Sequence, residues 1–456
     1  MRDRFLEVQY GHYEPAFFRM HIAIKEKIEH IDKLSPAAFA TLIHEYVHFI
    51  QDVTTLYGLG NIYNTVEFIK YATNQIYTEG QSFTVPIMPD TSTFNGSMIS
   101  FSSELERITL GSTSAHDNVR LLHGVKKYVP IQQHLDMKKM FVWELKVNGD
   151  TKFGAFNYQF GAGCIMESMA YILEKKLSGV DEDLPDLPYN SAKLVADKIY
   201  KGFSHNPLRL LALCDISLNC SNPAKAFTDL LIEWKHRNIK PHNARELYDD
   251  FYKHDYLFSE ETPVRVTKKI VKFYDEFTQY VKIARESLHS YFRPKETTNE
   301  DDFTIQMSLL NQWINEIMDS ALKWRKDYPS FIIDLAEGGQ DNNTSLVALY
   351  NDFGLPFCTN DNDEGCFYHP RIQTKKLQLN IFLAIGQIYR LLKKGKDVPC
   401  KLFNYCKKCE VDKTGDITPN ESCYAPWNRD NDDKLCPYAM LWKHWNLTGR
   451  KPKFLD

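Results

Sequence analysis

The pattern of apolar and polar positions predicts one helix more strongly than any other element, over residues 35–57. At 3.6 residues per turn, its apolar side chains form one broad face made of Leu42, Ile43, Tyr46, Val47, Phe49, Ile50, Val53 and Leu56. Ser35 and Pro36 are typical of a helix start, because Ser caps free N–H groups and Pro fits the first turn. The remaining strip is narrow and polar, and consists of His44, His48, Gln51, Asp52 and Thr55.

The periodicity of the other segments predicts an α+β chain that is predominantly helical. A strand is expected over residues 16–24, and Gly58 and Gly60 are expected to separate the first helix from a second one. Residues 79–135 indicate loops and short strands, and Asn148-Gly149 indicates the turn of a β-hairpin. Helical periodicity continues over 191–201, 207–218, 223–237, 244–253, 263–291, 304–328 and 373–394.

Changes in composition divide the chain into three predicted parts. Residues 1–180 contain the first helix and the predicted strands. An acidic stretch with two prolines then introduces a helical domain at 181–350. Residues 351–456 form a Cys-rich segment. A chain of 456 residues is long enough for about two or three such domains.

Composition and charge narrow the classes of partner. Hydrophobic residues make up 43% of the chain, charged residues 25%, and the net charge is -4. This balance gives no sign of nucleic-acid binding or of a polybasic membrane anchor. The first residues lack the apolar run of a signal peptide, and no apolar run approaches the length of a membrane span. We therefore expect a cytoplasmic protein.

The polar strip carries the residues that metal-assisted hydrolysis requires. His44 and His48 lie one helical turn apart, which lets both imidazoles bind one metal ion. The carboxylate of Glu45 can then take a proton from a metal-bound water as it attacks a carbonyl. No Lys or Arg occurs from residue 34 to residue 69, although exposed helix faces are usually rich in them. A zinc site is therefore favoured over the alternative, a surface helix that happens to carry two histidines.

The sequence His-Glu-Tyr-Val-His from His44 to His48 resembles the zinc-binding motif of the zincin metallopeptidases. The resemblance implies a zincin-like catalytic domain in which a small sheet lies against the motif helix, and it implies hydrolysis of peptide bonds. Gln51 and Thr54 stand where the metzincin branch has Gly and His. The chain is instead similar to the gluzincins, whose third zinc ligand is a Glu from a second helix.

Two glutamates could supply that third ligand. Glu67 would share its helix face with Lys70, which places a cation beside a dication. Glu167 would share its face with Ala170, which is small enough for two helices to pack closely. The run Glu-Ser-Met-Ala-Tyr that begins at Glu167 is also similar to the gluzincin segment Glu-Gly-x-Ala-x. We favour Glu167 and keep Glu67 as the alternative.

The cysteines predict a second metal. Seven of the ten lie after residue 350, and without a secretion signal this favours thiol or metal chemistry over disulfides. The spacing of Cys406 and Cys409 is typical of structural zinc sites, and the polar segments around them could not build a core alone. A second zinc ion or an iron–sulfur cluster is therefore expected on four of five thiols, namely Cys400, Cys406, Cys409, Cys423 and Cys436.

The resulting hypothesis is a zinc-dependent metallopeptidase, a hydrolase that cleaves a protein or peptide substrate. His44, His48 and Glu167 would hold zinc, and Glu45 would be the general base. Latency through a regulatory protein partner, or a very narrow specificity, would protect the cell from a cytosolic protease. Tyr158 and Tyr171 lie near enough to Glu167 in sequence to be considered as donors to an oxyanion. Two alternatives are a non-catalytic zinc-stabilised interaction protein and a zinc amidohydrolase that acts on a small amide.

Overall fold

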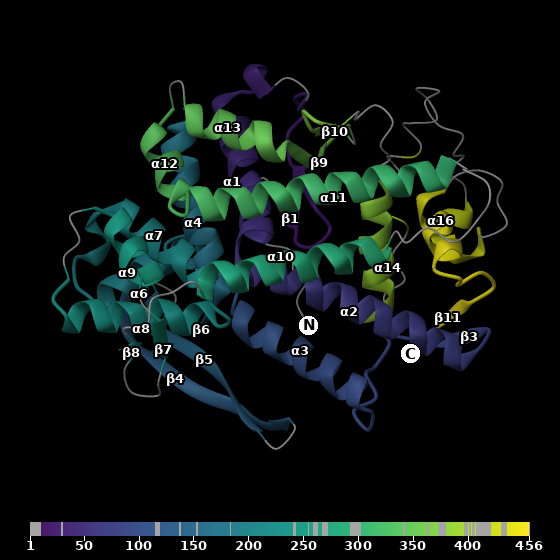
Figure 1. Cartoon of the computed structure of the whole chain (residues 1–456), viewed down its shortest axis with the longest axis horizontal. Coiled ribbons are helices and arrows are strands. Elements are labelled where there is room, and N and C mark those ends of the chain that lie inside the picture. The colour runs from purple at the N-terminus through teal and green to yellow at the C-terminus, as the bar shows by residue number, and fades with distance from the viewer. Residues whose placement is uncertain are drawn as a thin grey trace.

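A computed structural model describes most of the chain, and helices dominate it (Figure 1). Within some elements it describes the backbone alone. The described residues also form four small sheets. The prediction of an α+β, predominantly helical chain is therefore confirmed. The residues outside the description are 1–10, 29–30, 115–118, 136–137, 152–153, 183, 240–242, 254, 259–262, 267–271, 292–301, 341–342, 363, 373–379, 396–399, 401–402, 404–405, 407–420, 430–435 and 456.

The predicted motif helix is α1 (Pro36–Thr54), and it begins where the sequence indicates, because Ser35 accepts a hydrogen bond from the backbone N–H of Ala38. The helix ends at Thr55, whose hydroxyl caps the next helix, α2 (Leu56–Glu79). The predicted break at Gly58 and Gly60 is therefore wrong, since both glycines lie inside α2. A Cβ on Gly58 would lie 2.2 Å from a backbone oxygen of Asp52, so this glycine allows the two helices to approach closely.

The helix that positions the rest of the site is α4 (Ala162–Ser178), which packs along α1. Two long helices, α10 (Lys272–Tyr291) and α11 (Asp302–Asp327), run side by side across the front of the molecule, and α10 also packs on α2 (Figure 1). The other described α-helices are α3 (Phe94–Leu110), α5 (Asp186–Tyr189), α6 (Ser191–Ile199), α7 (Pro207–Leu218), α8 (Pro223–His236), α9 (Arg245–Lys253), α12 (Phe331–Gly338), α13 (Thr344–Phe353), α14 (Asn380–Lys394) and α16 (Pro437–His444).

Most predicted helices are confirmed to within a few residues, including α6 to α9 and α11. Two further predictions, on residues 263–291 and 79–135, are wrong in part. The helix expected over 263–291 begins only at Lys272, because residues 263–266 form a strand. Residues 79–135 contain a helix, α3, and a long strand, where loops and short strands were expected.

The sheet that packs against α1 joins distant parts of the chain. Strands β1 (Gly11–Glu14) and β2 (Arg19–Ile22) pair as an antiparallel hairpin. Strand β2, which confirms the strand expected over 16–24, pairs in parallel with β9 (Leu355–Asn360). Strand β9 pairs with β10 (Gly365–Tyr368), so the order is β1-β2-β9-β10.

A three-stranded sheet made of β4 (Val119–Leu135), β5 (Lys138–Thr151) and β6 (Gly154–Phe160) extends from the body as an arm (Figure 1). The predicted hairpin exists, but Asn148-Gly149 is not its turn: these residues pair with Asn157 and Phe156 inside the ladder of β5 and β6. The remaining described strands form two two-stranded sheets. Strand β3 (Ser82–Val85) pairs with β11 (Lys451–Phe454), and β7 (Asp255–Phe258) pairs with β8 (Pro263–Val266).

One apolar core runs through all three predicted parts of the chain. Within it, the guanidinium of Arg325 on α11 is fully buried and lies 2.6 Å from a carboxylate oxygen of Asp215 on α7. Arg325 also donates to the backbone oxygen of Thr54, at the end of α1. The core therefore does not follow the boundaries near residues 180 and 350, and the division into three domains stays a prediction.

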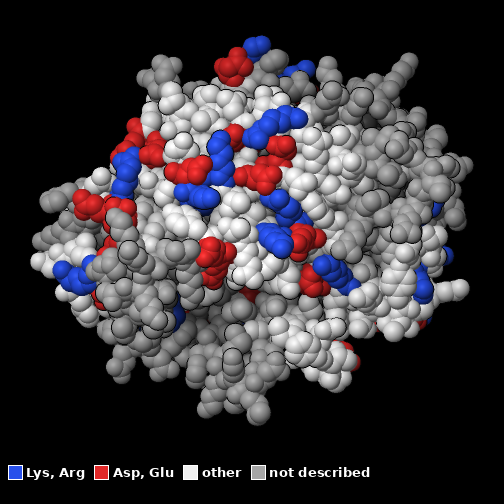
Figure 2. Space-filling model, viewed as in Figure 1, with Lys and Arg blue, Asp and Glu red and all other residues white. Residues whose placement is uncertain are grey.

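Acidic and basic side chains are interspersed on the face shown in Figure 2, as the small net charge implies. Within the described residues, no helix has the length and apolar character that crossing a membrane requires. The cytoplasmic location remains a prediction.

Candidate metal centre

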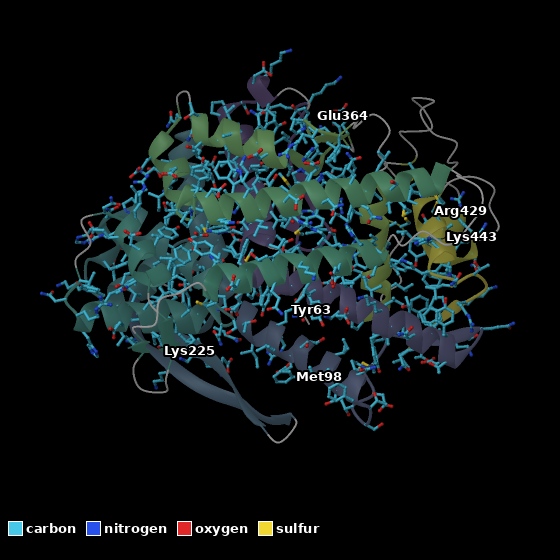
Figure 3. All side chains as sticks on the ribbon, viewed as in Figure 1. Tyr63, Met98, Lys225, Glu364, Arg429 and Lys443 are labelled. Carbon is cyan, nitrogen blue, oxygen red and sulfur yellow. The ribbon has the colours of Figure 1, made fainter. Side chains whose placement is uncertain are left out.

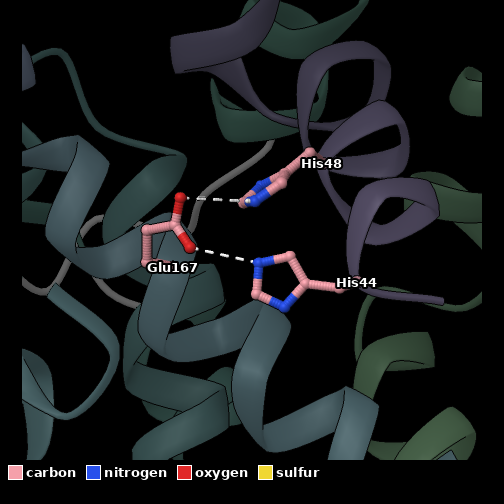
Figure 4. Close-up of side chains that lie close together, drawn as sticks. All are labelled: His44, His48 and Glu167. Atoms are coloured by element: carbon pink, nitrogen blue, oxygen red, sulfur yellow. Dashed lines mark hydrogen bonds and ion pairs between the residues drawn. The ribbon is translucent and has the colours of Figure 1, made fainter. Parts of the chain in front are cut away.

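His44 and His48 on α1 face Glu167 on α4 inside the protein (Figure 4). One potential ligand atom from each residue lies within 4.8 Å of the others, and all three side chains are buried. Nε2 of His44 is 3.1 Å from one carboxylate oxygen of Glu167, and Nε2 of His48 is 3.6 Å from the other. The packing of α4 along α1 thus brings the predicted ligand set together.

The second nitrogen of His48 is held by Gln51. Nδ1 of His48 lies 2.8 Å from Oε1 of Gln51, while Nε2 of Gln51 donates to the backbone oxygen of Met166. Because this second bond orients the amide, Nδ1 of His48 is the donor to Gln51, and Nε2 is the nitrogen that faces the centre. That nitrogen has no hydrogen-bond partner among the described residues and faces a carboxylate. Without a proton on Nε2, this nitrogen and the carboxylate are two acceptors that a cation between them would satisfy.

His44 lies between two carboxylates of α4. Its Nδ1 is 2.8 Å from Glu174, and its Nε2 is 3.1 Å from Glu167. Burial lowers the pKa of His44, but the hydrogen bonds to Glu167 and Glu174 outweigh burial and raise the pKa well above its usual value. Burial likewise raises the pKa of Glu167, and the attraction of His48 and His44 overcomes it, so that the pKa is about 2. A protonated His44 donates from Nδ1 to Glu174 and from Nε2 to Glu167, and a metal ion bound at Nε2 would replace the second of these protons.

Glu45 is fully buried, and neither of its carboxylate oxygens has a hydrogen-bond partner among the described residues. Burial raises its pKa to about 7, against the attraction of His44 and His48. A pKa near neutrality suits a group that accepts and returns a proton. A Cβ on Gly11 of β1 would lie only 3.0 Å from a carboxylate oxygen of Glu45, so glycine lets the strand approach this side chain.

A cavity of about 310 Å³ leads to this centre, and both His44 and Glu45 line it. These two side chains are buried, whereas Lys25, which also lines the cavity, is exposed. The cavity therefore connects the surface with the candidate base and one of the candidate ligands.

The side chains of the centre fit a zinc ion. Two imidazole nitrogens and one carboxylate form the ligand set of many catalytic zinc sites, which leave a fourth position open. Gln51 and Glu174 bond the second nitrogen of each imidazole, as is usual for metal-bound histidines. The group His44, His48 and Glu167 could therefore hold a metal ion.

Other candidates from the sequence lie elsewhere or have other partners. The carboxylate of Glu67 lies 2.7 Å from Nζ of Lys70, and both line a groove between α2 and α10. Of the two carboxylates considered as third ligand, only Glu167 lies with the histidines. The hydroxyls of Tyr158 and Tyr171 donate to backbone oxygens of residues 112 and 182, so these bonds occupy both proposed oxyanion donors.

Two residues near the centre were missed from the sequence. Glu174 lies seven residues after Glu167, and two helical turns place both on one face, so its spacing was a usable signal. Tyr189, at the end of α5, has its ring 6.0 Å from that of His44. Burial, with the nearby Glu167 and Glu45, raises the pKa of this tyrosine. No spacing pattern points to Tyr189, because a separate helix supplies it.

Four of the five C-terminal cysteines considered as ligands are described and buried, while Cys409 lies outside the described residues. The backbone N–H of Cys400 donates to the backbone oxygen of Cys423, and Arg429 donates to Sγ of Cys423 at 3.1 Å. Within the described part of the chain, the His44 group is the one set of three or more potential ligands whose atoms lie within 4.8 Å. The second metal, zinc or iron–sulfur, stays a prediction.

Comparison with known proteins adds no family to this geometry. No family model matches the chain, and no curated protein or solved structure is similar to it. The chemistry of the centre is therefore inferred from its own residues.

Proposed function

We propose that this chain is a zinc-dependent metallopeptidase of the gluzincin-like kind, which hydrolyses peptide bonds of a protein or peptide substrate. His44, His48 and Glu167 would hold the zinc ion. The proposal depends above all on Glu45, a fully buried carboxylate beside the candidate ligands and on the wall of a cavity, which has no hydrogen-bond partner among the described residues. Burying such a group costs free energy, and an ion that only stabilised the fold would gain nothing from it.

When bound, zinc lowers the pKa of a coordinated water towards neutrality and polarises the carbonyl under attack. A carboxylate oxygen of Glu45 takes a proton and later returns it to the leaving amine. Gln51 and Glu174 keep Nε2 of each imidazole directed at the ligand position. Burial of these side chains excludes bulk water, which strengthens each electrostatic interaction in the centre.

The test compares the wild type with Glu45→Gln, using the full chain loaded with zinc. Zinc per chain is measured by mass spectrometry of the metal, and cleavage is measured on a mixture of unfolded proteins and peptides. Glu45→Gln should retain its zinc and lose cleavage by roughly 10²- to 10⁴-fold, the usual range for a general base. Glu246→Gln, the same change at an exposed position on α9, is the matched control.

Three outcomes would contradict the proposal. Cleavage by Glu45→Gln at the wild-type rate would show that Glu45 is not the base. A wild type that binds zinc but cleaves no amide would be a non-catalytic, zinc-stabilised interaction protein. Hydrolysis of small amides without cleavage of any peptide would favour the amidohydrolase alternative.

A further inference from the structure

The cavity in front of Glu45 carries more acidic than basic side chains. Glu26 and Glu182 line it in addition to Glu45 and Glu174, which belong to the centre. Lys25 is the one lysine or arginine among its described lining residues, and it is exposed. The walls therefore favour a positively charged occupant.

Glu26 has an unsatisfied carboxylate oxygen. Its Oε2 is buried and has no hydrogen-bond partner among the described residues. A buried carboxylate oxygen without a partner costs free energy, and a rotation of the partly buried Glu26 side chain towards a cationic donor in the cavity would offset this cost. This observation, independent of the count of acidic residues, points to a cation as the missing partner.

The wall that carries Glu26 is held in place from outside the cavity. The side-chain amide of Asn360 donates to the backbone oxygen of Glu26 at 2.9 Å, and that of Asn362 donates to the backbone oxygen of Lys25 at 2.9 Å. Asn360 also donates to the carboxylate of Glu364, which Figure 3 labels in the turn between β9 and β10. The acidic residue is thus pre-positioned by the core sheet, and a ligand need not order it.

Apart from the hydroxyl side chains of Ser35 and Thr41, the rest of the lining is apolar. Ala37, Ala38 and Ala40 come from the first half of α1, and Ile24 and Leu184 lie on the surrounding segments. Alanine side chains leave room for a chain of methylene groups, and Lys and Arg bury such stems against apolar surfaces. The combination of apolar walls and carboxylates matches a long basic side chain better than a compact cation.

We infer that this cavity is a substrate pocket which binds the Lys or Arg side chain of a peptide through the carboxylates of Glu26 and Glu182. The inference rests on the proposed peptidase function and adds the class of substrate to it. The positive group of a peptide could also be its free α-amino group, which carries the same charge without the long stem.

The experiment measures peptide binding to zinc-loaded Glu45→Gln, which would hold substrate without cleaving it. The probes are fluorescent peptides of one alanine-based sequence, acetylated and amidated, with Lys, Arg, norleucine or Glu at each position in turn. An otherwise identical norleucine peptide with a free amino end tests the second source of charge. Dissociation constants come from fluorescence anisotropy.

We expect one peptide position at which Lys or Arg lowers the dissociation constant at least roughly tenfold relative to norleucine. A hydrogen bond to a charged group has this magnitude. Adding Glu26→Gln should remove most of that preference, Glu182→Gln should reduce it, and Glu246→Gln should leave it unchanged. Equal binding of Lys and norleucine peptides, or a preference that survives both Glu26→Gln and Glu182→Gln, would overturn the inference. A gain seen only with the free amino end would also overturn it.

Wild-type cleavage, measured in parallel, separates this inference from the proposed function. Cleavage of peptides without any preference for Lys or Arg would overturn the pocket assignment and leave the peptidase proposal intact. Charge-dependent binding that requires Glu26, in a wild type that cleaves nothing, would support the pocket and overturn the peptidase proposal.

Discussion

Nδ1 of His44 lies 2.8 Å from a carboxylate oxygen of Glu174, two helical turns beyond Glu167 on the same helix. The imidazole is therefore bonded at both nitrogens by carboxylates of α4. Because α4 also packs directly on α1, the position of the ligands is set by two helices and not by a loop. Such a centre should keep its geometry with and without metal.

The partners of the two imidazoles should control zinc affinity. Glu174→Ala and Gln51→Ala remove the acceptors at Nδ1, so we expect each to weaken zinc binding by about 10- to 100-fold. Glu174→Gln keeps an acceptor but loses the charge, and its affinity should lie between those of Glu174→Ala and the wild type. Competition with a chromophoric chelator measures these affinities. Unchanged zinc affinity in Gln51→Ala would show that the bond to His48 does not orient the ligand.

The identity of the third ligand predicts a difference in metal content. His44→Ala and Glu167→Ala should each lose one zinc ion per chain, whereas Glu67→Ala, whose carboxylate pairs with Lys70, should lose none. Metal analysis of protein purified without added zinc measures this content. If the C-terminal cysteines hold a second ion, the content should fall from two to one rather than from one to zero. Loss of zinc from Glu67→Ala alone would contradict the ligand set.

Stability of the metal-free protein should depend on pH through Glu45. Burial raises the native pKa of this group from 4.5 to about 7, so between these values the native state holds a proton that the unfolded chain has released. Stability from this group is therefore lost as the pH rises through that range. Glu45→Gln cannot ionise, so its unfolding free energy should exceed that of the wild type more at pH 8 than at pH 5. The excess at pH 8 should be greater by on the order of 2 to 3 kcal/mol. Urea unfolding in a chelator measures this difference, and an equal gain at both pH values would contradict it.

Gly58 and Gly60 should respond oppositely to the same substitution. A Cβ at position 58 would collide with the backbone of Asp52, so Gly58→Ala should lower the unfolding free energy by about 1 to 3 kcal/mol. A Cβ at position 60 would meet nothing within 4 Å, so Gly60→Ala should raise stability by about 0.5 to 1 kcal/mol, as expected inside a helix. Urea unfolding of both variants tests the pair. A stabilising Gly58→Ala would show that the two helices can separate without cost.

The local elements of this fold could be predicted where one signal dominated. Ser35 and Pro36 mark the start of α1, and the structure places it there. The rules for helix ends and turns gave wrong predictions where a glycine lies inside an element. Gly58 allows close contact with α1 and does not end a helix, and Asn148-Gly149 lies within a ladder that a third strand extends.

The candidate site could be predicted only in part, for a related reason. Helical spacing places His44 and His48 on one face of α1, and it could also have placed Glu167 and Glu174 on one face of α4. Each of these pairs lies within a single helix. Which helix faces α1 depends on packing between distant segments, and spacing cannot supply that information. The choice between Glu67 and Glu167 therefore needed a chemical argument, and Tyr189 had no signal at all.

The parallel pairing of β2 with β9 has a consequence for how the protein is made. Residues 355–360 lie between β2 and β10 in the sheet that packs against α1, and Asn360 at the end of β9 holds the backbone of Glu26. A chain growing on the ribosome therefore presents its two histidines early but completes their surroundings only after about four-fifths of its length has emerged. A truncated chain released before β9 would therefore carry His44, His48 and Glu167 without the complete sheet that packs against α1.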